Sequence, residues 1–219
     1  MLADGATDTT LGSDGRVIPD SSDATASDGT IIDAATNEAG DAADAADAAP
    51  IGCRGAVDCT RVVFVSSQDY TGALGGIVGA DAKCQTLADL STNPRIKGHT
   101  FQAWVSTLAD SVATRFVHGS QPYVLGNATV IASDWTDLTK GTLSAGIDLD
   151  ELSQTRNNVE AWTATDSSGA GYAGLGCESW VNGNAGGGVY GNVGGSGNGW
   201  SSSSADSCTK PNALYCFEK

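Results

Sequence analysis

Short apolar stretches alternate with turn-forming residues over most of the chain after its polar first quarter. RVVFVS at 61–66 is rich in β-branched and aromatic residues, and HTFQAWVS at 99–106 places Phe101, Ala103 and Val105 at alternate positions. Both patterns are typical of β-strands. Further strands are predicted at 159–165 (VEAWTAT) and 214–217, and a hairpin is predicted from 123–125 to 130–132 across the turn Gly126-Asn127.

Helical periodicity is confined to two short stretches. Residues 80–89 place Ala80, Cys84, Leu87 and Ala88 on one face, which predicts a helix with Cys84 pointing inward. A second, shorter helix is predicted in DWTDLTKG, with Ser133 or Asp134 as its cap and Gly141 as its stop. From Gly169 onward glycine, serine and asparagine dominate, so regular structure should be sparse there. Few helices, short strands and long loops predict an α+β fold.

Composition divides the chain into two parts. Residues 1–50 contain 11 of the 26 acidic residues and a single base, Arg16, and they lack aromatic residues and cysteine. Such a segment buries too little apolar surface to offset its ordering entropy, so we predict a disordered acidic tether at 1–50. A helix built on its alanine-rich end is the alternative. Residues 51–219 have the size of one domain.

The cysteines and the net charge limit the classes of function. Six cysteines, an even number, suit disulfides, which persist in oxidising compartments. We therefore expect a secreted or cell-surface protein. The formal net charge of −15 disfavours nucleic acid and anionic membranes as partners, and no stretch is long and apolar enough for a transmembrane helix. A local basic patch remains an alternative, from Arg54, Arg61, Arg95 and Lys97.

The first residues, MLADGATD, lack both the basic region and the apolar region of a signal peptide. Because disulfides imply export, we expect an export signal upstream of this start, and a lipoprotein signal with a lipid anchor is one form it could take.

Motifs for catalysis are missing from the sequence. It contains no G-x-S-x-G, H-E-x-x-H or phosphate-loop motif. His99 and His118 have no nucleophile beside them and are interpreted as surface or packing residues, with a general base as the alternative. The wide cysteine spacings do not suit zinc. We expect no enzyme. Two groups of acids are interpreted as caps and loop residues rather than acid–base pairs, namely Asp134 with Asp137, and Asp148 with Asp150 and Glu151.

Six blocks of sequence occur in a fixed order, namely GGIVGADAKCQTLAD, FQAWVST, SDWTDL, VEAWTATDSSG, GCESW and DSCTKPNALYCFE. In order and spacing they resemble the endostatin-like branch of the C-type lectin-like fold. The chain is most similar to a bacterial family of unknown function in that branch, found in secreted and lipid-anchored surface proteins. The resemblance covers about residues 61–218 and implies the disulfides Cys84–Cys216 and Cys177–Cys208. Cys53 and Cys59 lie outside it, and we expect them to pair locally.

The resemblance does not bring a calcium site with it. Calcium-dependent lectins of this fold use Glu-Pro-Asn or Gln-Pro-Asp with Trp-Asn-Asp, whereas this chain has Gln121-Pro122-Tyr123 and Trp200-Ser201-Ser202. Between Cys177 and Cys208 the only acids are Glu178 and Asp206, too few for a calcium shell. No cofactor is expected, and calcium is the lesser alternative.

Aromatic and amide side chains in the glycine-rich region have the chemistry of a glycan-binding surface. We therefore expect a non-catalytic binding module at the cell surface, with an extracellular protein or glycan as ligand. Packing in the core or against loops is the favoured interpretation of Trp162, Trp180 and Trp200, and binding through Trp180 and Trp200 is the alternative. A structural envelope protein is the second hypothesis, and a hydrolase is the third. The candidate ligand-binding residues are Trp180, Asn182, Asn184, Tyr190, Asn192 and Trp200.

Overall fold

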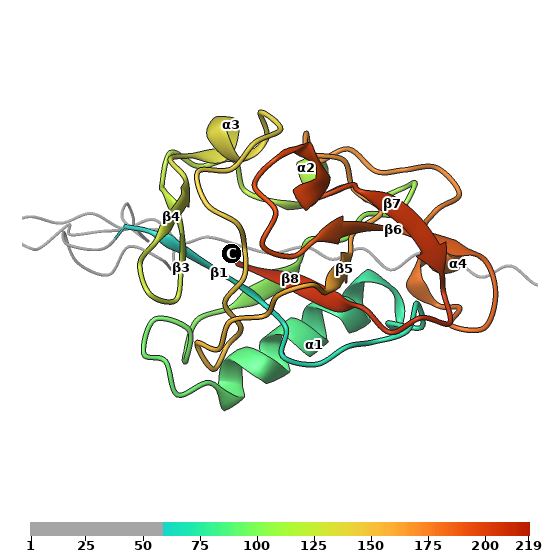
Figure 1. Cartoon of the computed structure of the whole chain (residues 1–219), viewed down its shortest axis with the longest axis horizontal. Helices are drawn as coiled ribbons and strands as arrows, with labels where there is room; N and C mark the ends of the chain where they lie inside the picture. The colour runs from blue at the N-terminus through green and yellow to red at the C-terminus, as the bar shows by residue number, and fades with distance from the viewer. Residues whose placement is uncertain (1–58) are drawn as a thin grey trace, which may run out of the picture. The chain divides into compact units, whose positions relative to one another are not determined.

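The computed structural model describes residues 59–219, which form a mixed α+β structure around one sheet (Figure 1). The predicted tether at 1–50 and Cys53 of the predicted Cys53–Cys59 bridge lie outside the described residues. The sheet runs in the order β4-β3-β1-β8-β5-β6-β7, and β2 pairs with β8 beside this path. Its strands are β1 (Arg61–Val65), β2 (Phe101–Ala103), β3 (Tyr123–Leu125), β4 (Val130–Ala132), β5 (Glu160–Trp162), β6 (Gly187–Asn192), β7 (Ser204–Ser207) and β8 (Ala213–Glu218).

The last strand, β8, joins the two halves of the sheet. Its whole length is buried, and it pairs antiparallel with β1 along one side. On the other side, its first residues pair parallel with β5 and its last residues pair antiparallel with β2. The last strand of the chain therefore pairs with three other strands, β1, β2 and β5.

The long helix α1 (Gly76–Leu90) contains the predicted helix at 80–89 and begins four residues earlier. Its buried face consists of the four predicted residues, from Ala80 to Ala88. The extra turn is formed by GIVG at 76–79. Glycine is required there because a Cβ on Gly79 would overlap the carbonyl oxygen of Leu74. The other helices are single turns, α2 (Val112–Arg115), α3 (Trp135–Leu138), α4 (Cys177–Trp180) and the 3-10 turn η1 (Asn198–Trp200).

The predicted hairpin and the second predicted helix are confirmed. β3 and β4 cover the predicted residues, and Asp134 caps α3 by accepting a hydrogen bond from the backbone N–H of Asp137 at 2.7 Å. The strand predicted at 99–106 is shorter, because the chain leaves β8 after Ala103 and the N–H of Ser106 donates to the carbonyl of Thr163.

The expectation that regular structure is sparse after Gly169 was wrong. β6 and β7 form an antiparallel pair that extends the sheet beyond β5. Two glycines of β6 let the strand fit, because a Cβ on Gly188 would crowd the Trp162 ring and one on Gly191 would overlap the backbone of Trp200. Tight packing thus selects glycine here against its low strand propensity.

Apolar side chains pack on both faces of the sheet. The face that carries α1 holds Phe64, Trp162, Trp180 and Leu214, and we call this the α1-side core. The other face holds the opposite core, in which Trp104 lies 4.9 Å from both Trp200 and Phe217 between ring centroids. Burial on both sides explains why consecutive residues are apolar along both central strands, over 62–65 in β1 and 213–217 in β8.

Two disulfides lie in the α1-side core. Cys84 of α1 bonds to Cys216 of β8, and Cys177 of α4 bonds to Cys208 just after β7. They are the two pairs that the family resemblance implied. Of the helices in residues 59–219, none is both long and apolar enough to cross a bilayer.

Candidate functional site

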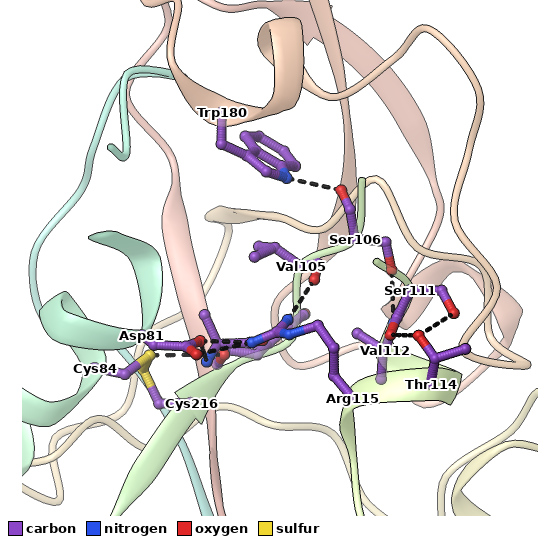
Figure 2. A network of polar contacts seen from close by, with 12 residues as sticks. Asp81, Cys84, Val105, Ser106, Ser111, Val112, Thr114, Arg115, Trp180 and Cys216 are labelled. Atoms are coloured by element: carbon purple, nitrogen blue, oxygen red, sulfur yellow. Dashed lines mark hydrogen bonds and ion pairs between the residues drawn. A yellow bond between two sulfur atoms is a disulfide. The ribbon is translucent and has the colours of Figure 1, made fainter. Parts of the chain in front are cut away.

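The two tryptophans expected to bind a ligand are buried. Trp180 is fully enclosed, and its indole N–H donates to the carbonyl oxygen of Ser106 at 2.8 Å (Figure 2). Trp200 is 1% exposed and packs between Trp104 and Tyr215. Neither indole presents a face to solvent, so their assignment to a ligand-binding surface is corrected: both are packing residues in this structure, as is Trp162.

Asn182 and Asn184 shape the loop that follows α4. The side-chain oxygen of Asn182 accepts hydrogen bonds from the backbone N–H groups of Asn184 and Ala185, at 2.8 and 3.3 Å. Asn182 is therefore committed to its own turn, whereas the side chain of Asn184 is exposed.

Tyr190 and Asn192 lie together on one face of β6. They are two residues apart in a strand, and they pair across to Trp162 and Glu160 of β5. Tyr190 packs against the α1-side core, which places Asn192 and Glu160 on that side of the sheet as well. The structure therefore brings together two of the six predicted ligand residues and adds a carboxylate to them.

An ammonium group joins this surface from the loop before β8. The Nζ atom of Lys210 lies 3.0 Å from Oε2 of Glu160, 2.6 Å from Oδ2 of Asp206 and 5.6 Å from the centroid of the Tyr190 ring. The two carboxylates raise the pKa of Lys210, and its ammonium lowers the pKa of Asp206. We define the polar face as Glu160, Tyr190, Asn192, Asp206 and Lys210.

A row of polar side chains extends this face toward β1. Asn212 precedes Ala213, which pairs with Ala161 in parallel strands, so Asn212 lies laterally beside Glu160. On its other side Asn212 forms an antiparallel bridge with Tyr70, whose ring also packs on the α1-side core. We define the polar row, across four chain segments, as Tyr70, Asn212, Glu160 and Asn192.

Sequence reasoning missed most of the polar face and row. Glu160 carries a usable signal, because it stands two positions before Trp162 in a predicted strand and so shares its face. Lys210 and Asn212 carry none, since their neighbourhood depends on β8 pairing with a strand more than fifty residues earlier. Only the sheet order brings them beside β5 and β6.

The turn α4 has a left-handed backbone. Its four residues, none of them glycine, have φ angles of 47°, 54°, 61° and 66°. L-residues adopt this conformation at a cost of about 1–2 kcal/mol each. Burial of Trp180 and the disulfide at Cys177 hold the turn at its two ends, while the side chains of Glu178 and Ser179 between them are exposed.

A polar network secures the junction between α1, β2 and α2 (Figure 2). The guanidinium of Arg115 pairs with both carboxylate oxygens of Asp81, at 2.8 and 2.9 Å, and also donates to the carbonyl of Val105. Asp81 in turn accepts from the N–H of Ala103. Both terminal nitrogens of the Arg115 guanidinium have partners within the fold, which indicates a structural role.

The two histidines lie in different surroundings. Nδ1 of His99 is 2.6 Å from Oε1 of Glu218, whose side chain is 1% exposed and whose other oxygen accepts from the N–H of Val62. The ring of His118 stacks on Trp135 at 4.1 Å. In the part of the chain that the structure describes, neither histidine is hydrogen-bonded to a hydroxyl or a thiol. Neither therefore has the nucleophile that a histidine base would activate.

Acidic residues in the two predicted groups serve the backbone. The carboxylate of Asp150 accepts hydrogen bonds from the backbone N–H groups of Leu152 and Gln154. The carboxylate of Glu151 accepts hydrogen bonds from the backbone N–H and the hydroxyl of Ser67. With Asp134 as the cap of α3, these contacts match the interpretation as caps and loop residues. Across residues 59–219, no group of three or more histidines, cysteines and acids is placed to hold a metal ion.

No protein-family model matches the chain, and no curated protein sequence matches it. The functional argument therefore proceeds from the geometry of the polar face.

Proposed function

We propose that this protein is an exported, non-catalytic binding module that recognises an extracellular ligand through its polar face. The observation that carries the proposal is the convergence of Glu160, Tyr190, Asn192, Asp206 and Lys210, from three strands and a loop, onto one accessible surface. Charged and amide groups beside a half-buried aromatic ring suit recognition of a polar ligand.

A C-type lectin-like fold of the endostatin-like type is part of this proposal. The mixed α+β architecture supports it, together with the long first helix and the final strand that a disulfide joins to it. The nested pairing of Cys177 with Cys208 inside Cys84–Cys216 also agrees with the family resemblance. This fold hosts many activities, so the function must come from the site itself.

Location outside the cytoplasm is supported by the same bonds. Both disulfides join buried cysteines, and such bonds persist in secreted and surface proteins. A lipid anchor upstream of the chain start, as in the similar bacterial family, belongs to the same proposal. Presentation at the cell surface fits a module that binds an extracellular protein or glycan.

A non-catalytic role is supported by the surroundings of the candidate bases. His99 pairs with a buried carboxylate and His118 with an indole, and the acids of the loops are occupied by backbone N–H groups. The polar face itself holds two carboxylates that both engage Lys210.

The proposal is tested by probing the purified full chain against cell-surface extracts and a printed glycan array. We expect saturable binding that is weakened at least about tenfold in the double variant Glu160→Gln/Asn192→Ala. Asp110→Asn, which changes an exposed acid away from the polar face, is the matched control and should bind normally.

Two results would contradict the proposal. Absence of any binding would favour the structural envelope protein. Turnover in a hydrolase panel that is abolished by His99→Ala or His118→Ala would instead identify an enzyme.

A further inference from the structure

Asn212 has an amide that makes no hydrogen bond. The residue is 2% exposed, and both its Nδ2 and its Oδ1 are buried without a partner. Among residues 59–219 it is the only carboxamide whose nitrogen and oxygen are both buried without a partner. Nearly all buried polar groups in proteins are paired, and an unpaired one is costly. An amide left in this state is suited to a partner that supplies one acceptor and one donor side by side.

Strand geometry directs this amide toward the polar row. Along β8 the side chains alternate, with Ala213 and Tyr215 in the opposite core and Leu214 and Cys216 in the α1-side core. Asn212 therefore belongs to the α1 side of the sheet. Tyr70 and Glu160 flank it there on the two neighbouring segments.

The charged groups that border this row are partly exposed. The side chain of Lys210 is 40% exposed and is held by ion pairs to the partly exposed Glu160 and Asp206. Ion pairs of this kind contribute little to stability. Displacement of the lysine by a ligand is therefore inexpensive, and it uncovers the Tyr190 ring that the ammonium lies over.

The chemistry of the surface favours a sugar over a protein. Protein interfaces depend on large apolar or aromatic anchors. The large apolar side chains that are exposed in the described part of the chain lie elsewhere, on α1, β4 and the loops at 108, 117, 152, 172, 175 and 181. The polar row instead offers two carboxamides and a carboxylate, with half-buried tyrosines at 70 and 190, which suits a ligand rich in hydroxyl groups.

We propose that the polar row is a carbohydrate subsite in which the Asn212 amide, enclosed in the unliganded protein, becomes accessible when the ligand moves neighbouring side chains aside and then binds two neighbouring hydroxyls of one sugar ring. One hydroxyl accepts from Nδ2 and the next donates to Oδ1, while Glu160 and Asn192 bind hydroxyls further along the ligand. Tyr70 and Tyr190 border the ring on either side of the amide. This inference rests on the proposed binding function and names its ligand class.

The test uses the full chain, a printed array of neutral, acidic and amino-sugar oligosaccharides, and calorimetry with the oligosaccharide that binds best. Asn212→Leu removes the amide at similar volume. We expect its affinity to fall at least about tenfold while its melting temperature stays equal or rises, because a buried unpaired amide is gone. Asn127→Leu, at an exposed amide in the turn between β3 and β4 at the opposite edge of the sheet, is the control and should bind as the wild type does.

A second measurement avoids any effect of substitution on folding. In the wild-type protein, the side-chain amide resonances of Asn212 should shift on titration with the same oligosaccharide. Resonances that stay in place would overturn the inference, and so would a leucine variant that melts several degrees lower yet binds equally well, because the amide is then structural.

The outcomes separate the inference from the proposed function. If sugars bind, and Glu160→Gln/Asn192→Ala weakens them while Asn212→Leu does not, the function stands and the Asn212 subsite is wrong. If only a protein from the extracts binds, the carbohydrate class is wrong and the module is still a binder. Absence of binding to either overturns both.

Discussion

At the scale of single residues, Glu218 is a buried carboxyl whose ionisation is disfavoured by its surroundings. Its carboxyl is buried beside His99 and accepts a backbone hydrogen bond from Val62. Burial raises its pKa above the ordinary glutamate value of 4.5, and the contacts with Val62 and His99 oppose that rise without cancelling it. Ionisation of Glu218 therefore works against the folded state.

The sign of this effect gives a prediction for Glu218→Gln. A raised pKa in the folded state contributes stability that is complete below the unfolded value and is lost as the pH rises through the folded value. The stability of the variant relative to wild type should therefore increase as the pH rises from 4 to 7. Urea unfolding at several pH values measures this, with the exposed Asp110→Asn as control. A constant difference across the range would contradict the prediction.

Residue identity alone did not separate residues of the polar face from packing residues. Trp180 and Trp200 stand among asparagines and glycines in the sequence, yet both are buried, whereas Tyr190 and Asn192 from the same region reach the polar face. The difference depends on which face of a strand or turn each residue occupies. A glycine-rich stretch has no apolar periodicity from which that face can be read.

At the scale of elements, α4 stands out because four consecutive L-residues are left-handed. The segment is fixed from outside, by the disulfide of Cys177, the indole hydrogen bond of Trp180 and a hydrogen bond from the N–H of Gly75 to the carbonyl of Trp180. Its conformation is therefore imposed by tertiary contacts against local preference.

Glycine within this turn should stabilise the protein. Ser179 has φ 61° and an exposed side chain, so Ser179→Gly removes a steric cost and few contacts. We expect the free energy of unfolding to rise by about 1 kcal/mol. Ser203→Gly, at an exposed site outside the left-handed region, should instead be neutral or destabilise by about 0.5 kcal/mol. A melting temperature that falls in Ser179→Gly would show that α4 is not left-handed in solution.

Elements with a local signal were predictable, and those built by packing were not. The hairpin at β3 and β4 follows from Gly126-Asn127, and the buried face of α1 follows from its 3.6-residue period. The strands β6 and β7 were not predicted because Gly188 and Gly191 lower the strand propensity of β6. Both glycines are needed there, since Trp162 and Trp200 pack too closely to leave room for a Cβ. Tertiary fit overrides propensity at such positions.

At the scale of the whole molecule, one sheet separates two cores, and two disulfides join segments that are far apart in the described chain. The bond between Cys84 and Cys216 joins the first helix to the last strand across 132 residues, whereas the bond between Cys177 and Cys208 spans 31. The first therefore restrains nearly the whole described chain, and the second restrains the region that carries β6, β7 and the polar face.

Loss of the two bonds should have unequal consequences. From loop length, Cys84→Ala/Cys216→Ala should lower the free energy of unfolding by about 5 kcal/mol, and Cys177→Ala/Cys208→Ala by about 4 kcal/mol. The first loss should weaken the whole fold, and the second should release hydrogen-exchange protection mainly in β6 and β7. Denaturant unfolding and hydrogen exchange of both variants measure this. A larger global loss from the shorter bridge would contradict it.

A covalently locked scaffold outside the cytoplasm is the claim on which the binding function depends. Non-reducing peptide mapping of protein purified from its native source, with free thiols alkylated at lysis, tests it most directly. We expect one peptide pair joined through Cys84 and Cys216 and another joined through Cys177 and Cys208. Recovery of these four cysteines as alkylated thiols, or in other pairs, would contradict the architecture, the export and the recognition role together.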